Sequence, residues 1–426
     1  MCGICGIFST SNGRRAAAAM TDAIRHRGPD DTGVASLIAA SGATFGAFGH
    51  RRLAIVDLSN AGHQPMFSAD GATCITYNGE IYNFAQLKRD LENEGVAFRS
   101  HCDTEVVLVG WEMHGISFLR RLRGMFALGI WDSVKERGYL IRDRFGIKPL
   151  YVAACDGQVI FASEVRALLA TGCVPRHLSD DAVASYLSTG SIAEPLTIID
   201  GIAAIPPGCM VEVVRSGKTF VMASPERFVQ TFEPSEAGGH HPRSHVHRIR
   251  NALRESVACH LVSDVPVAVF LSGGIDSSAV AGLASEVSAG PIESFTVTFD
   301  EADFSEAQPA REAALRYGTN HHEILLSGGD LFDALPDFFT AMDQPSLDGL
   351  NTFVVSRAVR AFGLKVVLSG LGGDELFGGY PSFHRARYLA HAWKLPSVIR
   401  RLGSMSANTF GDNRLSRISS VLTDTS

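Results

Sequence analysis

The chain has 426 residues, of which 46% are hydrophobic, so it can bury a sizeable core and by ordinary domain sizes holds two or three domains. Its formal net charge is -7, whereas proteins that bind nucleic acid or an anionic membrane usually carry basic patches. The charge therefore favours a protein that acts on small molecules. No apolar run approaches the roughly 20 residues of a membrane-spanning helix, and no signal-peptide pattern opens the chain. We therefore expect a cytoplasmic protein, and we expect its eight scattered cysteines to be reduced.

Short β-rich runs between turn residues occupy the chain from residue 1 to about 190 and predict a layered, sheet-rich domain. Apolar residues recur at helical spacing at about 84–94 and 103–114, which predicts two helices that cover the sheets. The β-rich runs are GICGIF, the stretch around HRRLAIVDL, ATCITYNGEIYN, MFALGIWD, GYLIRD and QVIFAS.

Between about 222 and 244 the periodic pattern ends in a stretch rich in Pro, Gly, Ser and His. We therefore divide the chain into a first domain at 1–220, a linker at 221–244 and a second domain at 245–426. The second domain begins with an amphipathic helix at about 246–257, followed by the buried strand VPVAVFL. Further strands at about 292–299, 321–326 and 364–369 alternate with helices near 277–287, 304–317 and 351–362. This rhythm predicts a parallel sheet that binds ligands at the carboxyl ends of its strands.

Cys2 follows Met1 directly, so removal of Met1 would place a thiol and a free α-amine on one residue. An α-amine with a pKa near ~8 can take the thiol proton, as in amino-terminal nucleophiles. Position alone favours a different interpretation, in which Cys2 is a small buried hydrophobe. Cys2 and Cys5 also form a C-x-x-C pair, but no second pair at zinc-finger spacing supports a metal or redox role.

Seven further segments, together with MCGI, resemble the glutamine amidotransferase domain of the asparagine synthetase family, in unbroken order over nearly 170 residues. The resemblance implies an Ntn-hydrolase-like four-layer αββα sandwich in which Cys2 attacks glutamine and releases glutamate and ammonia. The segments are RHRGPD (25–30), HRRLAIVDL (50–58), HQPM (63–66), YNGEIYN (77–83), SHCDTEV (100–106), RGMFALGIWD (123–132) and RDRFGIKPLY (142–151).

The same resemblance assigns a role to each residue around the substrate. The Asn78 side chain and the Gly79 N–H form the oxyanion hole, where donors stabilise the charge of the tetrahedral intermediate. Arg52 clamps the substrate α-carboxylate. Glu80 and Asp103 take the α-ammonium, although Asp103 also fits a helix N-cap, and the two roles are compatible. The main chain of Arg52, Leu53, Ala54, Ile55 and Val56 lines the pocket.

The segment SGGIDSS (272–278) lies between the buried strand and a helix that begins near Asp276. Gly273 and Gly274 let the backbone approach an anion, while helix N-terminal amides and the hydroxyls of Ser272, Ser277 and Ser278 point at phosphate oxygens. The alternative is an ordinary glycine turn before a helix. The lysine of a Walker A loop is missing, which disfavours γ-phosphate transfer of the usual kind.

The loop resembles the pyrophosphatase loop of N-type ATP enzymes, and so implies a Rossmann-like parallel-sheet ATP-pyrophosphatase domain. The resemblance implies ATP as a substrate, with nucleotide contacts from Leu271, Val297, Ser369 and Gly370, and Mg²⁺ on Asp276 and Asp374, assisted by Glu375. A carboxylate is adenylated there, and ammonia from the first domain attacks the acyl-adenylate, which releases AMP. Because ammonia has to arrive as NH₃, the resemblance also implies a shielded passage between the sites.

Two features depart from the family pattern. Leu371 stands where many members carry an acidic residue implicated in adenylation or amidation. The chain also stops 46 residues after Tyr380, without the Lys-x-Asp-Arg segment that supplies a catalytic lysine. We therefore expect a C-terminally shortened synthetase domain, either in a fragment of a longer protein or in a shortened homologue with impaired synthetase activity.

The leading hypothesis is a glutamine-dependent, ATP-consuming ligase of the asparagine synthetase type, with aspartate as the acceptor and asparagine, AMP and pyrophosphate as products. A second hypothesis is amidation of another carboxylate, such as a cell-envelope sugar acid or a secondary metabolite. A third is a glutaminase or regulatory binding protein with impaired synthetase activity. The resemblance and the prevalence of two-fold dimers also indicate a homodimer.

Overall fold

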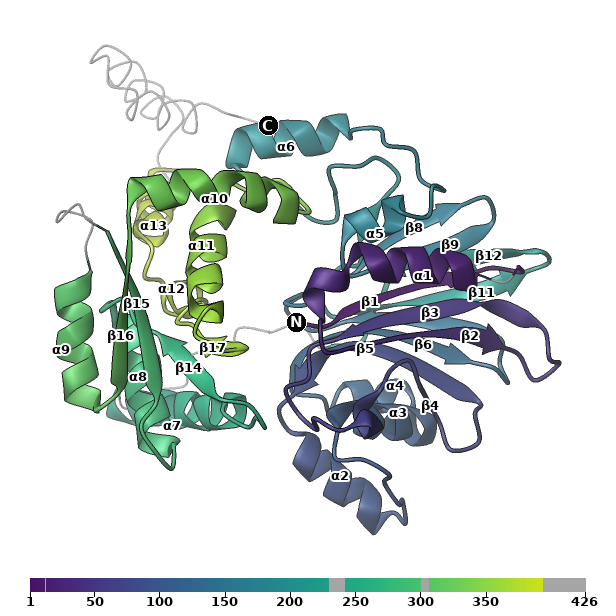
Figure 1. Ribbon diagram of the computed structural model, residues 1–426, viewed down its shortest axis with the longest axis horizontal. Coiled ribbons are helices and arrows are strands. Elements are labelled where there is room, and N and C mark those ends of the chain that lie inside the picture. The colour runs from purple at the N-terminus through teal and green to yellow at the C-terminus, as the bar shows by residue number, and fades with distance from the viewer. Residues whose placement is uncertain (12, 230–241, 300–305, 394–426) are drawn as a thin grey trace.

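The structure is a computed structural model that describes residues 1–11, 13–229, 242–299 and 306–393. The first domain lies on the right of Figure 1, in purple to teal, and the second domain lies on the left, in green to yellow. Residues 230–241 of the predicted linker at 221–244 lie outside the described residues. The amino terminus lies between the two domains, where the first strand begins (Figure 1).

Two antiparallel sheets form the centre of the first domain. Their strands are β1 (Gly3–Phe8), β2 (Asp31–Ile38), β3 (Thr44–Arg52), β4 (Met66–Phe67), β5 (Thr73–Ile81), β6 (Gly124–Asp132), β7 (Arg137–Arg142), β8 (Tyr151–Cys155), β9 (Gln158–Ala162), β10 (Ala203–Ala204), β11 (Cys209–Ser216), β12 (Thr219–Met222) and β13 (Glu226–Arg227). One sheet has the order β10-β8-β9-β1-β3-β2, and the other has the order β12-β11-β7-β6-β5-β4, with β13 also paired to β11.

Helices cover the outer face of each sheet. Buried apolar side chains join the first sheet to α1 (Arg14–Ala23) and α5 (Val165–Leu169). A second cluster joins the other sheet to α2 (Phe84–Asn93), α3 (Asp103–His114) and α4 (Ile116–Leu119). Between the sheets, aromatic rings such as Phe8, Phe48 and Trp131 pack edge to face or tilted. The predicted four-layer αββα sandwich is confirmed.

One β-rich run is shorter than the sequence indicates. The run HRRLAIVDL continues in apolar residues, yet β3 ends at Arg52 and the chain turns away through a loop and the 3-10 helix η2 (Asn60–Gly62). The strand ends here because the Arg52 guanidinium donates to main-chain carbonyls of the following loop, which are then not available for strand pairing. Asp57 in this loop also adopts a left-handed φ of 56°, which is not a strand conformation.

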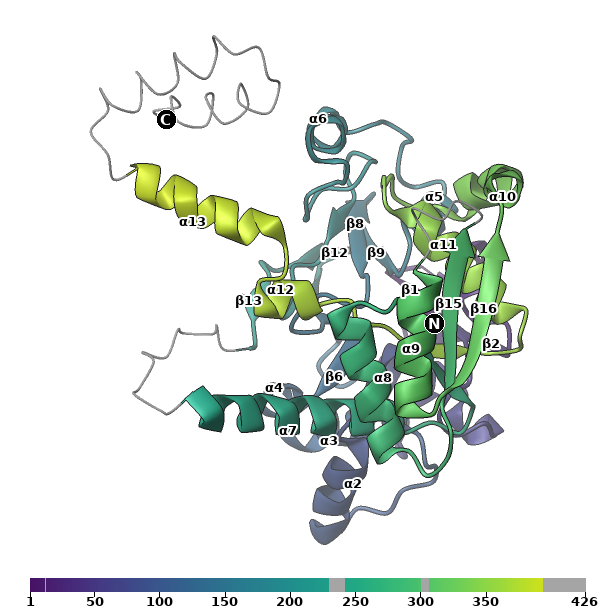
Figure 2. The same ribbon diagram turned by 90° about the vertical axis from the view of Figure 1, so that its left-hand side faces the viewer.

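The second domain contains a parallel sheet in the order β16-β15-β14-β17, so the predicted Rossmann-like sheet is confirmed. Its strands are β14 (Val267–Phe270), β15 (Glu293–Phe299), β16 (Asn320–Leu326) and β17 (Val366–Leu368), and its helices are α7 (Pro242–His260), α8 (Ile275–Val287), α9 (Ala307–Tyr317), α10 (Gly328–Ala341), α11 (Gly349–Arg360), α12 (Gly373–Phe377) and α13 (Pro381–Trp393). Apolar contacts place α7, α8 and α9 on one face and α11 on the other, as Figure 2 shows from the side.

The expectation of eight reduced thiols is wrong at one pair. Cys155 at the end of β8 and Cys173 in the loop after α5 form a disulfide, with Cα atoms 6.1 Å apart. Helix α5 folds back on its sheet and brings the two together, which the wide spacing of the cysteines does not reveal. The other six cysteines are free. Within the described residues, every helix is too short or too polar to cross a membrane.

A loop of the second domain reaches into the first. Asp343, after α10, accepts hydrogen bonds from the main-chain N–H groups of Val165 and Arg166 at 2.7 and 2.9 Å. These two N–H groups belong to the first two residues of α5. The N-cap residue of α5, Glu164, makes no hydrogen bond to them through its own side chain. The second domain therefore caps a helix of the first.

Candidate active site

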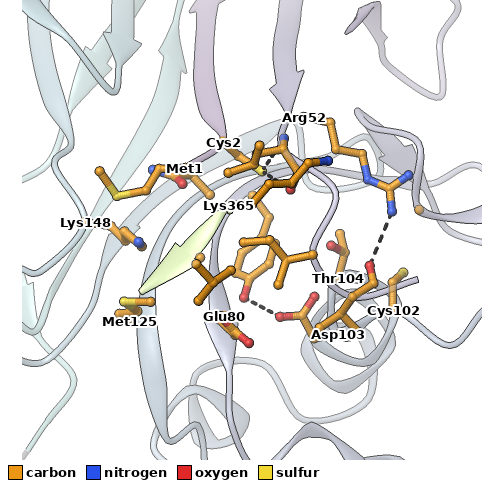
Figure 3. A pocket seen from close by; sticks show the side chains of 18 of the residues that line it. Met1, Cys2, Arg52, Glu80, Cys102, Asp103, Thr104, Met125, Lys148 and Lys365 are labelled. Carbon is orange, nitrogen blue, oxygen red and sulfur yellow. Dashed lines mark hydrogen bonds between the residues drawn. The ribbon is translucent and has the colours of Figure 1, made fainter. Parts of the chain in front are cut away.

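The Cys2 thiol lies in a cavity of about 490 Å³ that the first domain builds and β17 of the second domain closes. The Leu53 N–H donates to its Sγ at 3.4 Å, and Figure 3 shows Cys2 next to Met1 and Lys148. Burial raises the pKa of the Cys2 thiol, and burial lowers the pKa of the Met1 α-amine to about 5. With Met1 in place, a neutral thiol thus lies near a neutral α-amine at neutral pH.

Asn78 and Gly79 are on β5, at the wall of the same cavity. Asn78 is 1% exposed, and its Nδ2 has no hydrogen-bond partner among the described residues. Such an amide costs about 1–3 kcal/mol unless a ligand oxygen accepts from it. A side chain at Gly79 would lie 2.4 Å from the Met125 carbonyl oxygen, so only glycine fits there. Both residues line the cavity that contains Cys2, and their role as the oxyanion hole stays a prediction.

Arg52 shapes the loop that forms one side of the cavity. It is 7% exposed, and its guanidinium donates to the carbonyls of Ser59 at 2.7 Å and of Asp57. The Cβ of any residue at position 62 would lie 2.0 Å from Nη2, so Gly62 lets the guanidinium pack flat against the chain. Leu53, Ile55 and Val56 line the cavity as predicted, whereas Ala54 is buried beside it.

Two carboxylates lie on the opposite wall. Asp103 is the first residue of α3, and its Oδ2 accepts from the Tyr77 hydroxyl at 2.6 Å and the Ile81 N–H at 3.0 Å. The N-cap position belongs to Cys102, so the cap interpretation of Asp103 is wrong. Burial raises the pKa of Asp103, and burial together with the charge of Asp103 raises the pKa of Glu80 to about 7. A substrate ammonium would supply the cation that this pair lacks.

Three buried side chains support the cavity, and the sequence interpretation assigned none of them a role. Lys148 lines it at 4% exposure, and burial lowers the pKa of Lys148 to about 8. His50 bonds the Tyr77 carbonyl at 3.0 Å, and Gln64 accepts from the Tyr77 N–H at 2.7 Å, so together they hold the strand that presents Asn78. Lys148, His50 and Gln64 lie in GIKPL, HRR and HQPM, which belong to the segments that resemble the amidotransferase domain. That resemblance was the signal in the sequence that could have indicated a role for them.

An ion-pair network fixes the main chain of the cysteine. Arg27 donates through Nε to the Cys2 carbonyl at 2.9 Å and through Nη1 to Glu164 at 2.8 Å. His26 bonds the same Glu164 oxygen at 2.9 Å. These contacts hold Cys2 at the start of β1 with its side chain toward the cavity.

The segment SGGIDSS connects β14 to α8 in the second domain, as predicted. Ser277 Oγ lies 2.9 Å from Ser272 Oγ and 3.2 Å from the Gly274 carbonyl, which folds the loop over the helix start. Gly273 has a φ of 76° and packs against Pro309. Ser278 is in the first turn of α8, and Leu271 is buried below the loop.

The second predicted loop packs directly on the first. A Cβ at Gly370 would lie 2.8 Å from the Ser277 N atom, and a Cβ at Gly373 would lie 2.2 Å from Asp276 Oδ2. Ser369 and Gly370 share a cavity of about 240 Å³ with Asp276. Val297 is half-buried on β15 and is not among the described residues that line this cavity.

Asp276 and Asp374 lie in the first turns of the helices that follow the two loops. Asp276 contacts Gly373, and Asp374 is the next residue along the chain. Carboxylate oxygens beside a phosphate-binding loop are the donors that Mg²⁺ prefers, so this donor set fits the ion. Within the described residues no group of three or more His, Cys, Asp or Glu side chains could hold a metal, so Asp276 and Asp374 as Mg²⁺ ligands stay a prediction.

A larger cavity of about 960 Å³ lies next to both sites and shares lining residues with each. It shares Glu80, Met125 and Ile147 with the cavity around Cys2, and it shares Ser369 and His260 with the cavity at Asp276. Leu371 lines all three cavities and is 88% exposed. The residue that departs from the family pattern therefore lies where the cavities meet.

Comparison with known proteins agrees with both halves of this geometry. A family model for the glutamine amidotransferase domain matches residues 1–224, and a model for asparagine synthase matches residues 248–421. A putative glutamine-hydrolysing asparagine synthetase 2 of Methanocaldococcus jannaschii is 32% identical, over 95% of this chain and 80% of that protein. The chain belongs to the glutamine-hydrolysing asparagine synthetase family.

Other members of the asparagine synthetase family are longer. Asparagine synthetase 1 of Bacillus subtilis is 33% identical over 94% of this chain, but this chain spans only 62% of that protein. The names also vary, since a relative from Penicillium rubens, amidase chyE, is 33% identical over 89% of this chain and 58% of its own length. Membership in the asparagine synthetase family thus leaves the acceptor open.

Proposed function

We propose that the protein is a glutamine-dependent amidotransferase and ligase in which Cys2 releases ammonia from glutamine. One observation carries this proposal: the buried Asn78 Nδ2 has no hydrogen-bond partner among the described residues and shares a cavity with the Cys2 thiol. Arg52 on one wall and the carboxylates of Glu80 and Asp103 on the other match the two charges of a free amino acid. A peptide would leave at least one of these charged groups unpaired.

In the first reaction, removal of Met1 exposes the α-amine of Cys2, which takes the thiol proton. The thiolate attacks the side-chain amide carbonyl of glutamine, and the Asn78 amide with the Gly79 N–H receives the developing oxyanion. Collapse of the tetrahedral intermediate expels ammonia with a proton returned from the amine. Water then hydrolyses the thioester and gives glutamate.

In the second reaction, a carboxylate attacks the α-phosphorus of ATP, which forms an acyl-adenylate and pyrophosphate. The amides and hydroxyls of 272–278 hold the phosphates, with Ser369 and Gly370 beside them. Bound through Asp276 and Asp374, Mg²⁺ would neutralise phosphate charge during this step. Ammonia passes by way of the cavity that lies next to both sites, attacks the acyl-adenylate and displaces AMP.

The acceptor we favour is aspartate, which gives asparagine, because the family resemblance extends over both domains. Leu371 supports a second candidate, namely another carboxylate, because it replaces the acidic side chain that many members carry at this place. Relatives named amidases point the same way. We also propose a cytoplasmic homodimer, in line with the supply of glutamine and ATP and with the prevalence of two-fold assemblies.

The test combines two product assays on the purified protein after Met1 removal. Glutamate release from glutamine alone reports the first reaction. Pyrophosphate release with ATP, Mg²⁺, glutamine and a panel of carboxylates reports the second reaction and its acceptor. Absence of glutamate release contradicts the proposed glutaminase, while pyrophosphate release with a carboxylate other than aspartate identifies the second candidate.

A further inference from the structure

Asp264 of the second domain makes two hydrogen bonds to the loop that forms the cavity around Cys2. Its carboxylate Oδ2 accepts from the Asp57 N–H at 2.7 Å, and its own N–H donates to the Ile55 carbonyl at 3.0 Å. Asp264 lies in the short connection between α7 and β14. The second domain thus holds the segment 53–57 through both a side chain and the main chain.

A second contact from the same domain reaches the other end of this segment. Lys365 donates through Nζ to Asp30 Oδ2 at 2.8 Å, and the same carboxylate oxygen accepts from the Ala54 N–H at 2.8 Å. Burial opposes the charge of Asp30, but the bonds from Lys365 and Ala54 hold the pKa of Asp30 below its ordinary value. The carboxylate is therefore ionised at neutral pH and ties Ala54 to Lys365.

The segment between these contacts carries the residues that shape the cavity. Arg52 is held by the carbonyls of Val56 and Asp57, so a shift of this segment would move the guanidinium. Leu53 bonds the Cys2 thiol from the same segment. Asp57 keeps a left-handed φ of 56°, which is uncommon outside glycine and has to be supported by its surroundings.

Both contacts arise at the same end of two paired strands. Asp264 precedes β14 and Lys365 precedes β17, and these strands pair in parallel with Val267 opposite Val366. At their other ends the strands lead into the two loops at 272–278 and 369–374. A rigid strand pair therefore runs from the glutamine-side loop to the nucleotide-side loops.

We propose that Asp264 and Lys365 are positioning residues through which the second domain completes the glutamine pocket, by fixing segment 53–57 and with it Arg52. The inference rests on the proposed glutaminase function. It predicts that loss of either contact weakens the capture of glutamine while leaving the chemistry at Cys2 largely intact. Lys365 lines the cavity, but its Nζ bonds Asp30, and the Asp264 side chain bonds Asp57.

The experiment measures steady-state glutamate release for Asp264→Ala and Lys365→Met. We expect the KM for glutamine to rise about tenfold in each variant, in the range for loss of a charge-assisted hydrogen bond, with kcat within about twofold. Asp264→Asn keeps an acceptor oxygen for the Asp57 N–H and should restore most of the affinity.

Glu255→Gln is the matched control, because it breaks an ion pair with Arg123 across the same domain boundary, at 3.2 Å, without touching segment 53–57. An unchanged KM in Asp264→Ala and Lys365→Met, or an equal rise in Glu255→Gln, would overturn the proposal. A fall in kcat alone in the two test variants would overturn it as well.

A second measurement separates this proposal from the proposed function. Hydrogen exchange followed by mass spectrometry reports the amides of Ala54 and Asp57 without any turnover. Exchange should be faster in a peptide spanning 53–58 of Asp264→Ala and Lys365→Met than in the unaltered protein or in Glu255→Gln. Equal exchange in all four contradicts the positioning role, whereas faster exchange in a protein without glutaminase activity contradicts only the proposed function.

Discussion

The side-chain nitrogen of Asn78 is buried in the cavity that contains the Cys2 thiol, and no residue in the described part of the chain hydrogen-bonds to it. A buried donor without a partner destabilises the protein when the cavity is empty. It can donate a hydrogen bond once a substrate carbonyl oxygen lies beside it. The arrangement stabilises the charge that develops on a carbonyl oxygen during attack by the thiolate more than it stabilises the uncharged carbonyl.

Replacement of Asn78 tests this idea directly. We expect Asn78→Ala to lower kcat for glutamate release by about 10²–10³-fold, the range for loss of one oxyanion donor, with a much smaller change in KM. Steady-state kinetics of glutamate release provide the measurement. A rise in KM with unchanged kcat would instead assign Asn78 to substrate binding.

Replacement of the nucleophile should abolish the first reaction. We expect no measurable glutamate release from Cys2→Ala, because water alone cannot form the thioester. Cys5→Ala is the control, since Cys5 is fully buried and its thiol lies beside Ala17 and Thr21 rather than in the cavity. Similar loss of glutamate release in both variants would show a structural effect and argue against the assignment of Cys2.

The pH dependence of glutamine capture should report Glu80. The pKa of Glu80 is raised to about 7, and the substrate ammonium needs the ionised form. As the pH falls below 7, protonation removes this partner, so kcat/KM for glutamine should fall by up to about tenfold per pH unit. Glu80→Gln should have a raised KM and a flatter profile between pH 5.5 and 7.5. An unchanged profile in this variant would exclude Glu80 as the titrating group.

The nucleotide loop offers a backbone test. Gly273 has a φ of 76°, and a Cβ there would lie 2.5 Å from Pro309 Cβ and 2.9 Å from the Ala310 N atom. Gly273→Ala should weaken binding of ATP with Mg²⁺ about tenfold or more, as measured by calorimetry, because strain of about 1–3 kcal/mol distorts the loop. Gly290→Ala, where a Cβ meets open space, should bind ATP normally.

The sequence predicted those parts of the fold whose signal is local. Strands such as β1 and β6 are almost wholly buried, and α2 presents Leu87 and Leu91 to the core at helical spacing, so their patterns are strong. Helix α10 was missed because Pro336 lies inside it, although its start carries a capping box at Ser327. Its stability comes partly from tertiary contacts, such as those of the buried Phe338.

The candidate site was predictable where the residues occur in recognisable segments, and less so where two domains meet. Cys2, Asn78 and Asp103 come together as expected, although they are far apart along the chain. The end of β3 at Arg52, the disulfide of Cys155 and the contacts of Asp264 depend on long-range geometry. A sequence without aligned relatives contains no local signal for such pairs.

The cap that Asp343 provides to α5 limits how the two halves can be separated. If residues 1–224 were produced alone, the amides of Val165 and Arg166 would lose the carboxylate that accepts from them, and the first turn of α5 would fray. Glu164, which binds Arg27 behind Cys2, directly precedes that turn. If halves are exchanged between related enzymes, the first domain should therefore keep its activity only when the new second domain has an equivalent carboxylate after α10. The loop that contains Asp343 thus decides which halves can be combined in a chimaeric enzyme.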